Sequence, residues 1–373
     1  MRRNDKARME RLISRHPDAV VSTDGAMHRR DQLLVPVEHS DRAREFRADA
    51  VEGVEPYPEI GVHLLRLRSA AQIDVPEFAA QLRDQGIRAT PNHLLRGEPN
   101  YIGGPFGAPT LCGPVQAPVA NGEGRRVTVA VLDTGITPHP WFTSTGWWSE
   151  VTPEQLDPIA ADSDYELDAQ SGHGTFVAGV VLQKAPNAYL WIDRVLDDIG
   201  VCDELGLLHS LDRIQRREKA TGTKVDVVNL SLGGYAHHDE PSPLVAESLR
   251  RFGSHTVIAT AAGNNASDRP FWPAALKDCV AVGAKATFSD RGWWVDASAP
   301  GVDVAGPFAQ RRPDGEIDLG FARWSGTSFA SPYVAGAIAH LANDKDITAR
   351  EAAEILLNTA NPDADPDFGV EIG

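Results

Sequence analysis

Residues 127–135 read V-T-V-A-V-L-D-T-G, an apolar run that ends in an acidic residue, a threonine and a glycine. Runs of this kind, without alternation of apolar and polar residues, are typical of strands buried on both faces of a parallel sheet. In open α/β sheets, binding sites form at the carboxyl ends of such strands. The stretch therefore predicts a buried strand with Asp133 at its functional end.

Apolar runs alternate with helical patterns after residue 125, which indicates an α/β body, residues 126–373, with a parallel sheet and helices on both faces. Further strands are expected at residues 189–195, 225–230, 256–261 and 280–284. Helices are expected at residues 174–182, 202–220, 243–252 and 328–343.

Residues 100–125 are rich in Gly and Pro without a sustained hydrophobic period, which marks a linker. It separates the body from a small α/β N-terminal domain, residues 1–99. Within this domain the patterns predict helices at 5–15, 41–48 and 75–85 and strands at 33–37 and 62–68. The run 87–95 contains Pro91 and is therefore expected to be an edge strand.

The charge of the chain is acidic, with 36 Lys+Arg against 52 Asp+Glu and a formal net charge of −16. All of the excess lies after residue 100. An acidic body repels nucleic acid and anionic membranes, so neither is expected as a partner. It favours a basic peptide partner, although solubility alone is a sufficient reason for such a surface.

Cysteine usage and the N-terminal sequence bear on the compartment. Cys112, Cys202 and Cys279 lie far apart, which argues against a disulfide framework and against a zinc site. The basic N-terminus is not followed by an apolar run, so no cleaved secretion signal is expected. A cytoplasmic location fits both features.

Two further segments carry chemically active side chains. S-G-H-G-T at 171–175 places His173 between glycines at a helix start, where neighbours can approach the imidazole closely. S-G-T-S-F-A-S-P at 325–332 places Ser328 where a loop becomes a helix, beside backbone N–H groups that can bind an oxyanion. Taken singly, each also fits a helix cap, and D-T-G alone also occurs in aspartic peptidases, which need a second such motif.

The segment A-A-G-N at 261–264 ends an expected strand and adds the side-chain amide of Asn264. With Asp133, His173 and Ser328, it completes a set of nucleophile, base, orienting acid and amide donor. Serine acyl transfer requires these four groups.

Five motifs together make the body resemble the subtilisin family of serine peptidases. They are D-T-G at 133–135, G-H-G-T at 172–175, S-L-G-G at 231–234, A-A-G-N at 261–264 and G-T-S-x-A-S-P at 326–332. The chain order Asp, His, Ser is the one known for subtilisin.

The resemblance implies a serine endopeptidase in which Asp133 orients His173 and His173 takes the proton of Ser328. It assigns Asn264 and the Ser328 N–H to the oxyanion hole. It also implies a substrate strand paired with one wall of the primary pocket and facing a second wall. These walls are Ser231, Leu232 and Gly233, and Ala261, Ala262 and Gly263.

The chain departs from the family pattern in two places. A calcium-binding loop commonly interrupts the helix after the catalytic histidine, whereas here A-P-N-A at 185–188 leads directly to the next strand. We therefore expect no calcium there, no other metal and no cofactor, and an acidic loop at 162–168 that is solvated. Phe271, before Trp272 and Pro273, is expected at the floor of the primary pocket, where it would restrict the substrate to small or medium side chains. The Trp272–Pro273 bond is a candidate for the cis form.

Several alternatives stay open at this level. The N-terminal domain has the length of a subtilisin propeptide that blocks the cleft, with residues 98–101 as its tail, but a permanent domain that binds substrate or a partner protein also fits. A catalytically silent peptide-binding module and an esterase or acyl transferase are further alternatives. The expected partner is a peptide or protein substrate.

Overall fold

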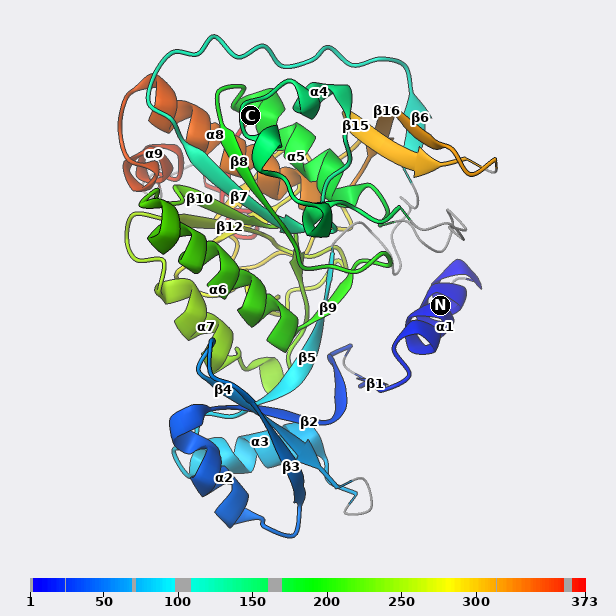
Figure 1. Cartoon of the computed structure of the whole chain (residues 1–373), viewed down its shortest axis with the longest axis vertical. Coiled ribbons are helices and arrows are strands. Elements are labelled where there is room, and N and C mark those ends of the chain that lie inside the picture. The colour runs from blue at the N-terminus through cyan, green and yellow to red at the C-terminus, as the bar shows by residue number, and fades with distance from the viewer. Residues whose placement is uncertain are drawn as a thin grey trace.

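The computed structural model of the chain describes residues 3–23, 25–68, 72–97, 109–159, 170–312, 314–358 and 364–373. In the body, seven parallel strands form the central sheet, in the order β17-β14-β13-β12-β10-β7-β8 (Figure 1). Their bounds are β7 Thr128–Asp133, β8 Tyr189–Arg194, β10 Val227–Leu230, β12 Val257–Ala261, β13 Val280–Gly283, β14 Ala297–Ser298 and β17 Val370–Glu371.

Helices cover both faces of this sheet, as the alternation of side chains on β7 illustrates. Val129 and Val131 belong to one apolar cluster, and Ala130 and Leu132 to another. The first cluster holds residues of α5 His173–Lys184, α8 Thr327–Asp344 and α9 Ala349–Leu356. The second holds residues of α6 Glu204–Thr221 and α7 Pro243–Arg250. The predicted parallel sheet with helices on both faces is confirmed.

The predicted strands and helices of the body agree with the structure to within two residues at each end. One predicted helix differs from the structure in the type of its first residues, at the start of α6. Residues 201–203, partly assigned to the helix, form the short strand β9 Val201–Asp203 instead. The Asp203 side chain accepts the Gly206 N–H at 2.9 Å and so caps a helix that begins at Glu204.

The N-terminal part is an antiparallel sheet with the strand order β5-β2-β4-β3, covered on one face by two helices. Its elements are α1 Arg3–Arg15, β1 Ala19–Val21, β2 Met27–Pro36, α2 Ser40–Phe46, β3 Val51–Tyr57, β4 Val62–Leu67, α3 Val75–Asp84 and β5 Thr90–Gly97. The sequence did not reveal β3, an edge strand that contains Gly53 and Pro56 and has little apolar alternation.

The expectation that Pro91 marks an edge strand is wrong. β5 lies inside the sheet, because β2 pairs with one side of it and β9 and β11 Leu232–Gly233 of the body pair with its end. Pro91 lies opposite Leu33 of β2. The pairing of β5 with the body begins only at Leu94, so at Pro91 the described residues pair with one side of β5 alone. A missing N–H is tolerated in such a place.

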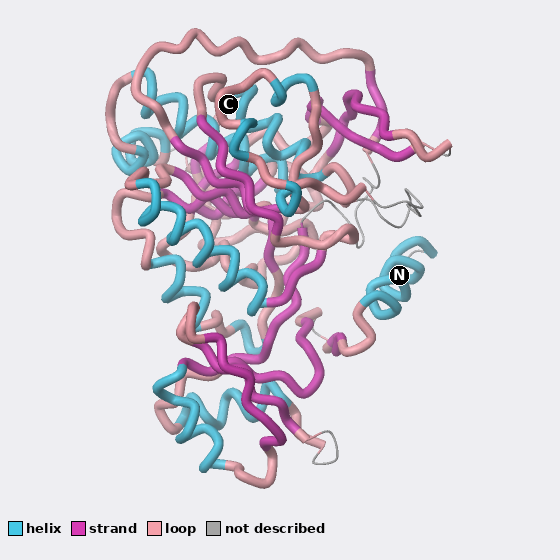
Figure 2. Tube along the Cα trace, viewed as in Figure 1, coloured by secondary structure: helices cyan, strands magenta, loops and turns pink. Residues whose placement is uncertain are grey.

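The second face of the N-terminal sheet packs on the body. Leu34 and Leu64 share an apolar cluster with Leu208 of α6 and Leu244 of α7. Figure 2 shows β5 running from the N-terminal sheet up into the body. Burial of apolar surface therefore holds the two parts together.

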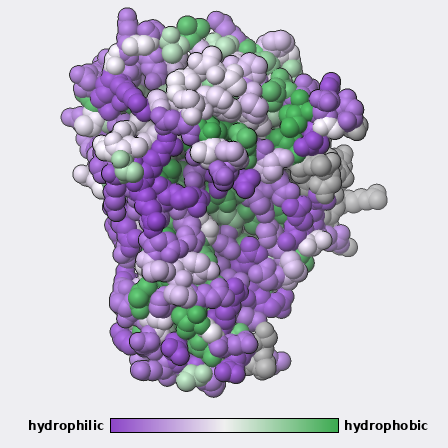
Figure 3. All heavy atoms as spheres, in the orientation of Figure 1, coloured by the Kyte–Doolittle hydropathy of each residue, from purple (hydrophilic) through white to green (hydrophobic). Residues whose placement is uncertain are grey.

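A third sheet contains the hairpin β15 Val304–Arg311 and β16 Ile317–Trp324, together with β6 Thr110–Cys112. β6 lies within the predicted linker, whose following residues run without regular structure past the top of the view to β7 (Figure 1). The short helix α4 Pro140–Thr143 follows β7. The face in Figure 3 is mainly hydrophilic, with hydrophobic residues in separate patches. Among the described residues, no helix has the length and apolarity required to cross a membrane.

Candidate active site

Asp133 and His173 meet at the carboxyl end of β7. Asp133 ends this strand, His173 begins α5, and Nδ1 of His173 lies 2.7 Å from Oδ1 of Asp133. Both side chains are buried. A Cβ at position 174 would overlap the carbonyl oxygen of Gly135 and lie 3.2 Å from the Asp133 Cβ, so Gly174 permits the approach of the two elements. An N–H on Nδ1 that donates to Asp133 leaves Nε2 of the neutral ring as the proton acceptor.

A second carboxylate, Asp157, joins the turns that carry these two residues. It accepts hydrogen bonds from the Thr134 hydroxyl at 2.6 Å and from the Gly172 N–H at 3.0 Å. The Thr134 oxygen in turn accepts the Gly174 N–H at 3.0 Å. Burial raises the pKa of Asp157 to about 6, although its hydrogen bonds oppose the shift. The sequence reasoning missed Asp157, since Q-L-D-P-I carries no local signal for this role.

Ser328 is the second residue of α8 and is fully buried. Its hydroxyl donates to the Ser231 carbonyl at 3.4 Å, and its carbonyl accepts the Ser231 hydroxyl at 2.9 Å. The His173 ring lies beside the next residue, Phe329, with 5.5 Å between ring centroids. Nε2 of His173 is buried and has no hydrogen-bond partner within the part of the chain that the structure describes. The base is therefore held at the start of the helix that carries the serine, with its acceptor atom unused.

Asn264 is fastened to the same helix start. Its Oδ1 accepts the Thr327 N–H at 2.9 Å, while the Gly263 N–H donates to the Thr327 hydroxyl at 3.1 Å. The first N–H groups of a helix have no partner inside the helix and make its N-terminus favourable for negative charge. The amide of Asn264 and the N-terminus of α8 thus lie side by side at Ser328.

The predicted substrate walls lie beside these residues. The first wall is already paired in the structure: Leu232 and Gly233 of β11 lie opposite Gly97 and Arg96 of β5. The opposite side of β5 pairs with β9, which the sequence reasoning missed because a three-residue strand has too few positions to show a period. Residues 94–97 therefore lie as a strand between β9 and β11, where a substrate strand was expected.

The second wall, Ala261, Ala262 and Gly263, continues from the end of β12 and is buried. Phe271 is also fully buried, and it packs in one apolar cluster with Ala262 and Tyr235. The Trp272–Pro273 bond is cis, as the sequence suggested.

Metal-binding groups and disulfides were also considered in the sequence. Among the described residues, no group of three or more His, Cys, Asp or Glu side chains is arranged to hold a metal ion. The helix after His173 ends at Lys184 and β8 begins at Tyr189, so the connection is short, as expected. Residues 98–101 and the acidic loop at 162–168 lie outside the described residues. Cys112, Cys202 and Cys279 are free thiols.

Comparison with known proteins shows the family of the body. Residues 124–372 match the model of the subtilase family. The thermophilic serine proteinase of Bacillus sp. (strain AK1) is 32% identical over 290 residues, which are 71% of this chain and 66% of that protein. Subtilisin BL of Lederbergia lenta is 35% identical over 244 residues, or 60% of this chain and 80% of that protein.

The crystal structure of fervidolysin from Fervidobacterium pennivorans, described as a keratinolytic enzyme related to subtilisin, is similar with a TM-score of 0.60. At 19% identity, and with 94% of this chain and 62% of that chain covered, this likeness concerns the fold alone. The chain spans 66% of the Bacillus proteinase and 57% of the alkaline protease of Alkalihalobacillus alcalophilus, so it accounts for only part of these relatives. Through residues 124–372, the chain belongs to the subtilase family of serine peptidases.

Proposed function

We propose that this chain is a serine endopeptidase with Ser328 as nucleophile, His173 as general base and Asp133 as the acid that orients the base. The observation that carries the proposal is the buried 2.7 Å contact between His173 and Asp133, held against the N-terminus of the helix that bears Ser328. Asn264, bonded to the neighbouring Thr327 N–H, is the proposed side-chain donor of the oxyanion hole.

In the proposed reaction, the Ser328 hydroxyl transfers its proton to Nε2 of His173 while Oγ bonds to the carbonyl carbon of the scissile peptide bond. The negative charge that develops on the carbonyl oxygen is stabilised by the Asn264 amide and the Ser328 N–H. The C–N bond then breaks, and His173 gives its proton to the leaving amine. Water hydrolyses the resulting acyl-enzyme, with His173 again acting as base and then as acid.

An extended peptide is the substrate that best fits the channel between β9 and β11, in which residues 94–97 lie. β9 and β11 each present backbone groups to the strand between them, which is a mode of recognition by strand addition. Small esters and acyl donors have no such strand to offer. The pairing of residues 94–97 with β9 and β11 therefore favours a peptidase over an esterase.

We also propose that the N-terminal part blocks this channel while it stays bound. Its strand β5 fills the place of a substrate strand, and its sheet buries an apolar face on α6 and α7. A peptide substrate would have to displace residues 94–97 before it could pair with β11.

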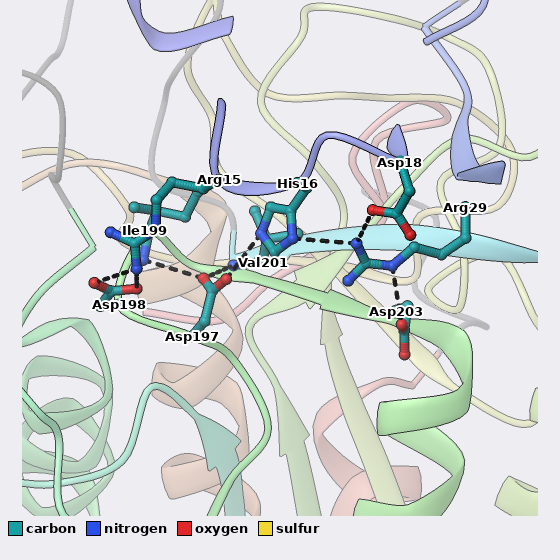
Figure 4. Close-up of polar contacts among 9 residues, drawn as sticks. All are labelled: Arg15, His16, Asp18, Arg29, Asp197, Asp198, Ile199, Val201 and Asp203. Carbon is teal, nitrogen blue, oxygen red and sulfur yellow. Dashed lines mark hydrogen bonds and ion pairs between the residues drawn. The ribbon is translucent and has the colours of Figure 1, made fainter. Parts of the chain in front are cut away.

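Ion pairs add to this contact around β9 (Figure 4). Two arginines and a histidine of the N-terminal part each contact an aspartate of the body. The distances are 2.6 Å from Arg15 to Asp198, 2.9 Å from His16 to Asp197 and 3.0 Å from Arg29 to Asp203. The N-terminal part is thus bound to β9 and the residues before it at several points.

Labelling of the full chain by a fluorophosphonate probe tests the nucleophile. Labelling should be lost in Ser328→Ala and strongly slowed in His173→Ala, and cleavage of an unfolded protein substrate should disappear with it. Because the bound N-terminal part is proposed to block the site, the refuting result is one obtained after that part has been removed. A folded wild-type body that is neither labelled nor active on peptides would refute the enzyme and favour a silent peptide-binding module.

Intact mass of the active protein beside Ser328→Ala tests the fate of the N-terminal part. Its removal in the active form alone supports self-processing, and an active form of full mass refutes it.

A cytoplasmic location stays a proposal from the sequence, and fractionation of the source cells would test it. One relative, the minor extracellular protease Epr of Bacillus subtilis, is extracellular by name.

A further inference from the structure

Asp290 is a fully buried aspartate whose carboxylate lies beside the loop at residues 263–267, which carries Asn264. Its Oδ1 accepts the Asn265 N–H at 2.8 Å and the Ser267 N–H at 2.9 Å. The backbone N–H of Asp290 donates to the Gly263 carbonyl at 2.9 Å. Asp290 therefore binds the residues on both sides of Asn264 and also the end of the loop.

The backbone of this loop requires such support. Ala266 has a φ of 55°, in the left-handed region that is costly for a residue with a Cβ. The two N–H groups that the Asp290 carboxylate accepts belong to the residues immediately before and after Ala266. The Ala266 N–H itself donates to the Phe288 carbonyl at 2.8 Å. Since a sparsely populated conformation persists only where its surroundings determine it, the carboxylate of Asp290 helps to set the shape of the loop.

The carboxylate of Asp290 is itself held in one orientation. A Cβ at position 263 would overlap Oδ2 of Asp290, so Gly263 lets the carboxylate lie against the backbone of the loop. The same Oδ2 accepts the hydroxyl of the buried Tyr235 at 2.7 Å. Both oxygens of Asp290 thus have hydrogen-bond donors, and the group cannot turn away from the loop without the loss of these bonds.

The loop connects Asp290 to the helix that bears Ser328. Oδ1 of Asn264 accepts the Thr327 N–H at 2.9 Å, so the side-chain NH2 of Asn264 is the group that can donate to an oxyanion. The position of this NH2 depends on the backbone of residue 264, whose two neighbours are bonded to Asp290. A displacement of ~1 Å in a reacting geometry can lower a rate by ~10².

We propose that Asp290 is a positioning residue for the oxyanion hole, which acts through the loop at residues 263–267 to hold the side-chain amide of Asn264 at the N-terminus of α8. This inference rests on the proposed endopeptidase activity. The oxyanion forms only when Ser328 attacks, so a displaced donor should lower kcat and leave KM nearly unchanged. A carboxylate that served stability alone would instead lower the melting temperature without this change in kcat.

Steady-state cleavage of an internally quenched peptide tests the proposal on the purified protein, with its intact mass recorded. The value of kcat is referred to the amount of Ser328 that a fluorophosphonate probe labels, so that blocked molecules are not counted. Asp290→Ala should lower kcat by ~10–10², less than the ~10²–10³ lost with a whole oxyanion donor, and should change KM by less than about 3-fold. Asp290→Asn should keep kcat within about 5-fold of the wild type, because its amide oxygen can still accept the two N–H groups.

A double-mutant cycle separates positioning from stability. In the Asn264→Ala background, Asp290→Ala should change kcat by less than about 3-fold, since the donor that Asp290 positions is already absent. Equal losses in the two backgrounds, or a folded Asp290→Ala protein with the kcat of the wild type, would overturn the inference. If Asp290→Ala does not fold, Tyr235→Phe decides in its place: loss of one hydrogen bond to Asp290 should lower kcat by ~2–10-fold, and only where Asn264 is present. An unchanged kcat in Tyr235→Phe, or an equal loss in both backgrounds, would then overturn it.

Asp296→Ala is the matched control. Asp296 also accepts a backbone N–H, that of Ala281 at 2.8 Å, but this bond lies at β13 and not at the loop that carries Asn264. The substitution should leave kcat and KM unchanged while it lowers the melting temperature. A loss of kcat equal to that in Asp290→Ala would show a general effect of destabilisation and overturn the inference. Absence of probe labelling in a wild-type body freed of its N-terminal part would instead contradict the proposed function on which the inference rests.

Discussion

Acidification should loosen the N-terminal part, because three imidazoles meet where it packs on the body. His28 and His93 come from β2 and β5, and His237 comes from the body. Nδ1 of His28 lies 3.0 Å from Nε2 of His237, and the His237 ring lies 6.0 Å from that of His93. Glu204 accepts from His93 at 3.0 Å, and it also accepts the Ser242 hydroxyl.

The sign and size of the effect follow from His28. Burial, reinforced by the positive charges of His237 and His93, lowers the pKa of His28 to about 4 from 6.5, while Asp74 raises it and Arg30 lowers it further. His28 takes up fewer protons while the N-terminal part is bound to the body than after its release. Its contribution to the free energy of binding of the N-terminal part is therefore complete above pH 6.5 and is lost as the pH falls towards 4. When the pH falls from 7 to 5, the equilibrium constant for release of the N-terminal part should increase by about 20-fold, which corresponds to about 1.8 kcal/mol.

Hydrogen exchange of residues 94–97 in Ser328→Ala measures this equilibrium without self-cleavage. After correction for the intrinsic exchange rate, the opening constant should increase by about 20-fold from pH 7 to pH 5. His28→Asn serves as the matched variant, because its amide can replace Nδ1 in the bond to His237 but does not titrate. It should lose most of the increase. An equal increase in both proteins would show that His28 does not control the contact.

Three further perturbations test the site and its surroundings. Asn264→Ala should lower kcat by ~10²–10³, the loss found when a subtilisin loses its oxyanion amide, with little change in KM; steady-state kinetics measure this, and an unchanged kcat would remove Asn264 from the oxyanion hole. Asp157→Asn should lower kcat by roughly 10-fold and remove a step near pH 6 from the acid side of the kcat profile, since burial raises the pKa of Asp157 to about 6; profiles of equal shape would contradict its role between the two turns. Arg29→Ala should increase the exchange of residues 94–97 by ~2–10-fold, because the partly buried pair with Asp203 is lost. Arg47→Ala, which breaks an exposed ion pair with Asp49, is the control for Arg29→Ala. Equal effects of the two substitutions on the exchange of residues 94–97 would refute a role of Arg29 in holding the N-terminal part.

The sequence predicted the body well because its signals are local. The predicted strands of the parallel sheet are runs of apolar residues, and the predicted helices have a period and an end signal within their own segments. The two-residue strands β14 and β17 and the helix α9 were not predicted. Asp133, His173 and Ser328 stand at a strand end or at helix starts, where the neighbouring glycines and apolar runs made each a candidate. Their combination, with the resemblance to the subtilisin family, assigned their roles. The hydrogen bonds of Asp157 had no local sequence signal, because its partners Gly172 and Thr134 lie 15 and 23 residues away in the chain.

The sequence by itself determined the fold class and the identity of the candidate catalytic residues. Only the tertiary structure decided that β5 lies between β9 and β11, that Phe271 fills the space between two glycines, and that His28 meets His237. Strands of two or three residues have no period of their own and are stabilised by pairing with partners distant in the sequence. The space between two walls likewise depends on segments that no local pattern relates to each other.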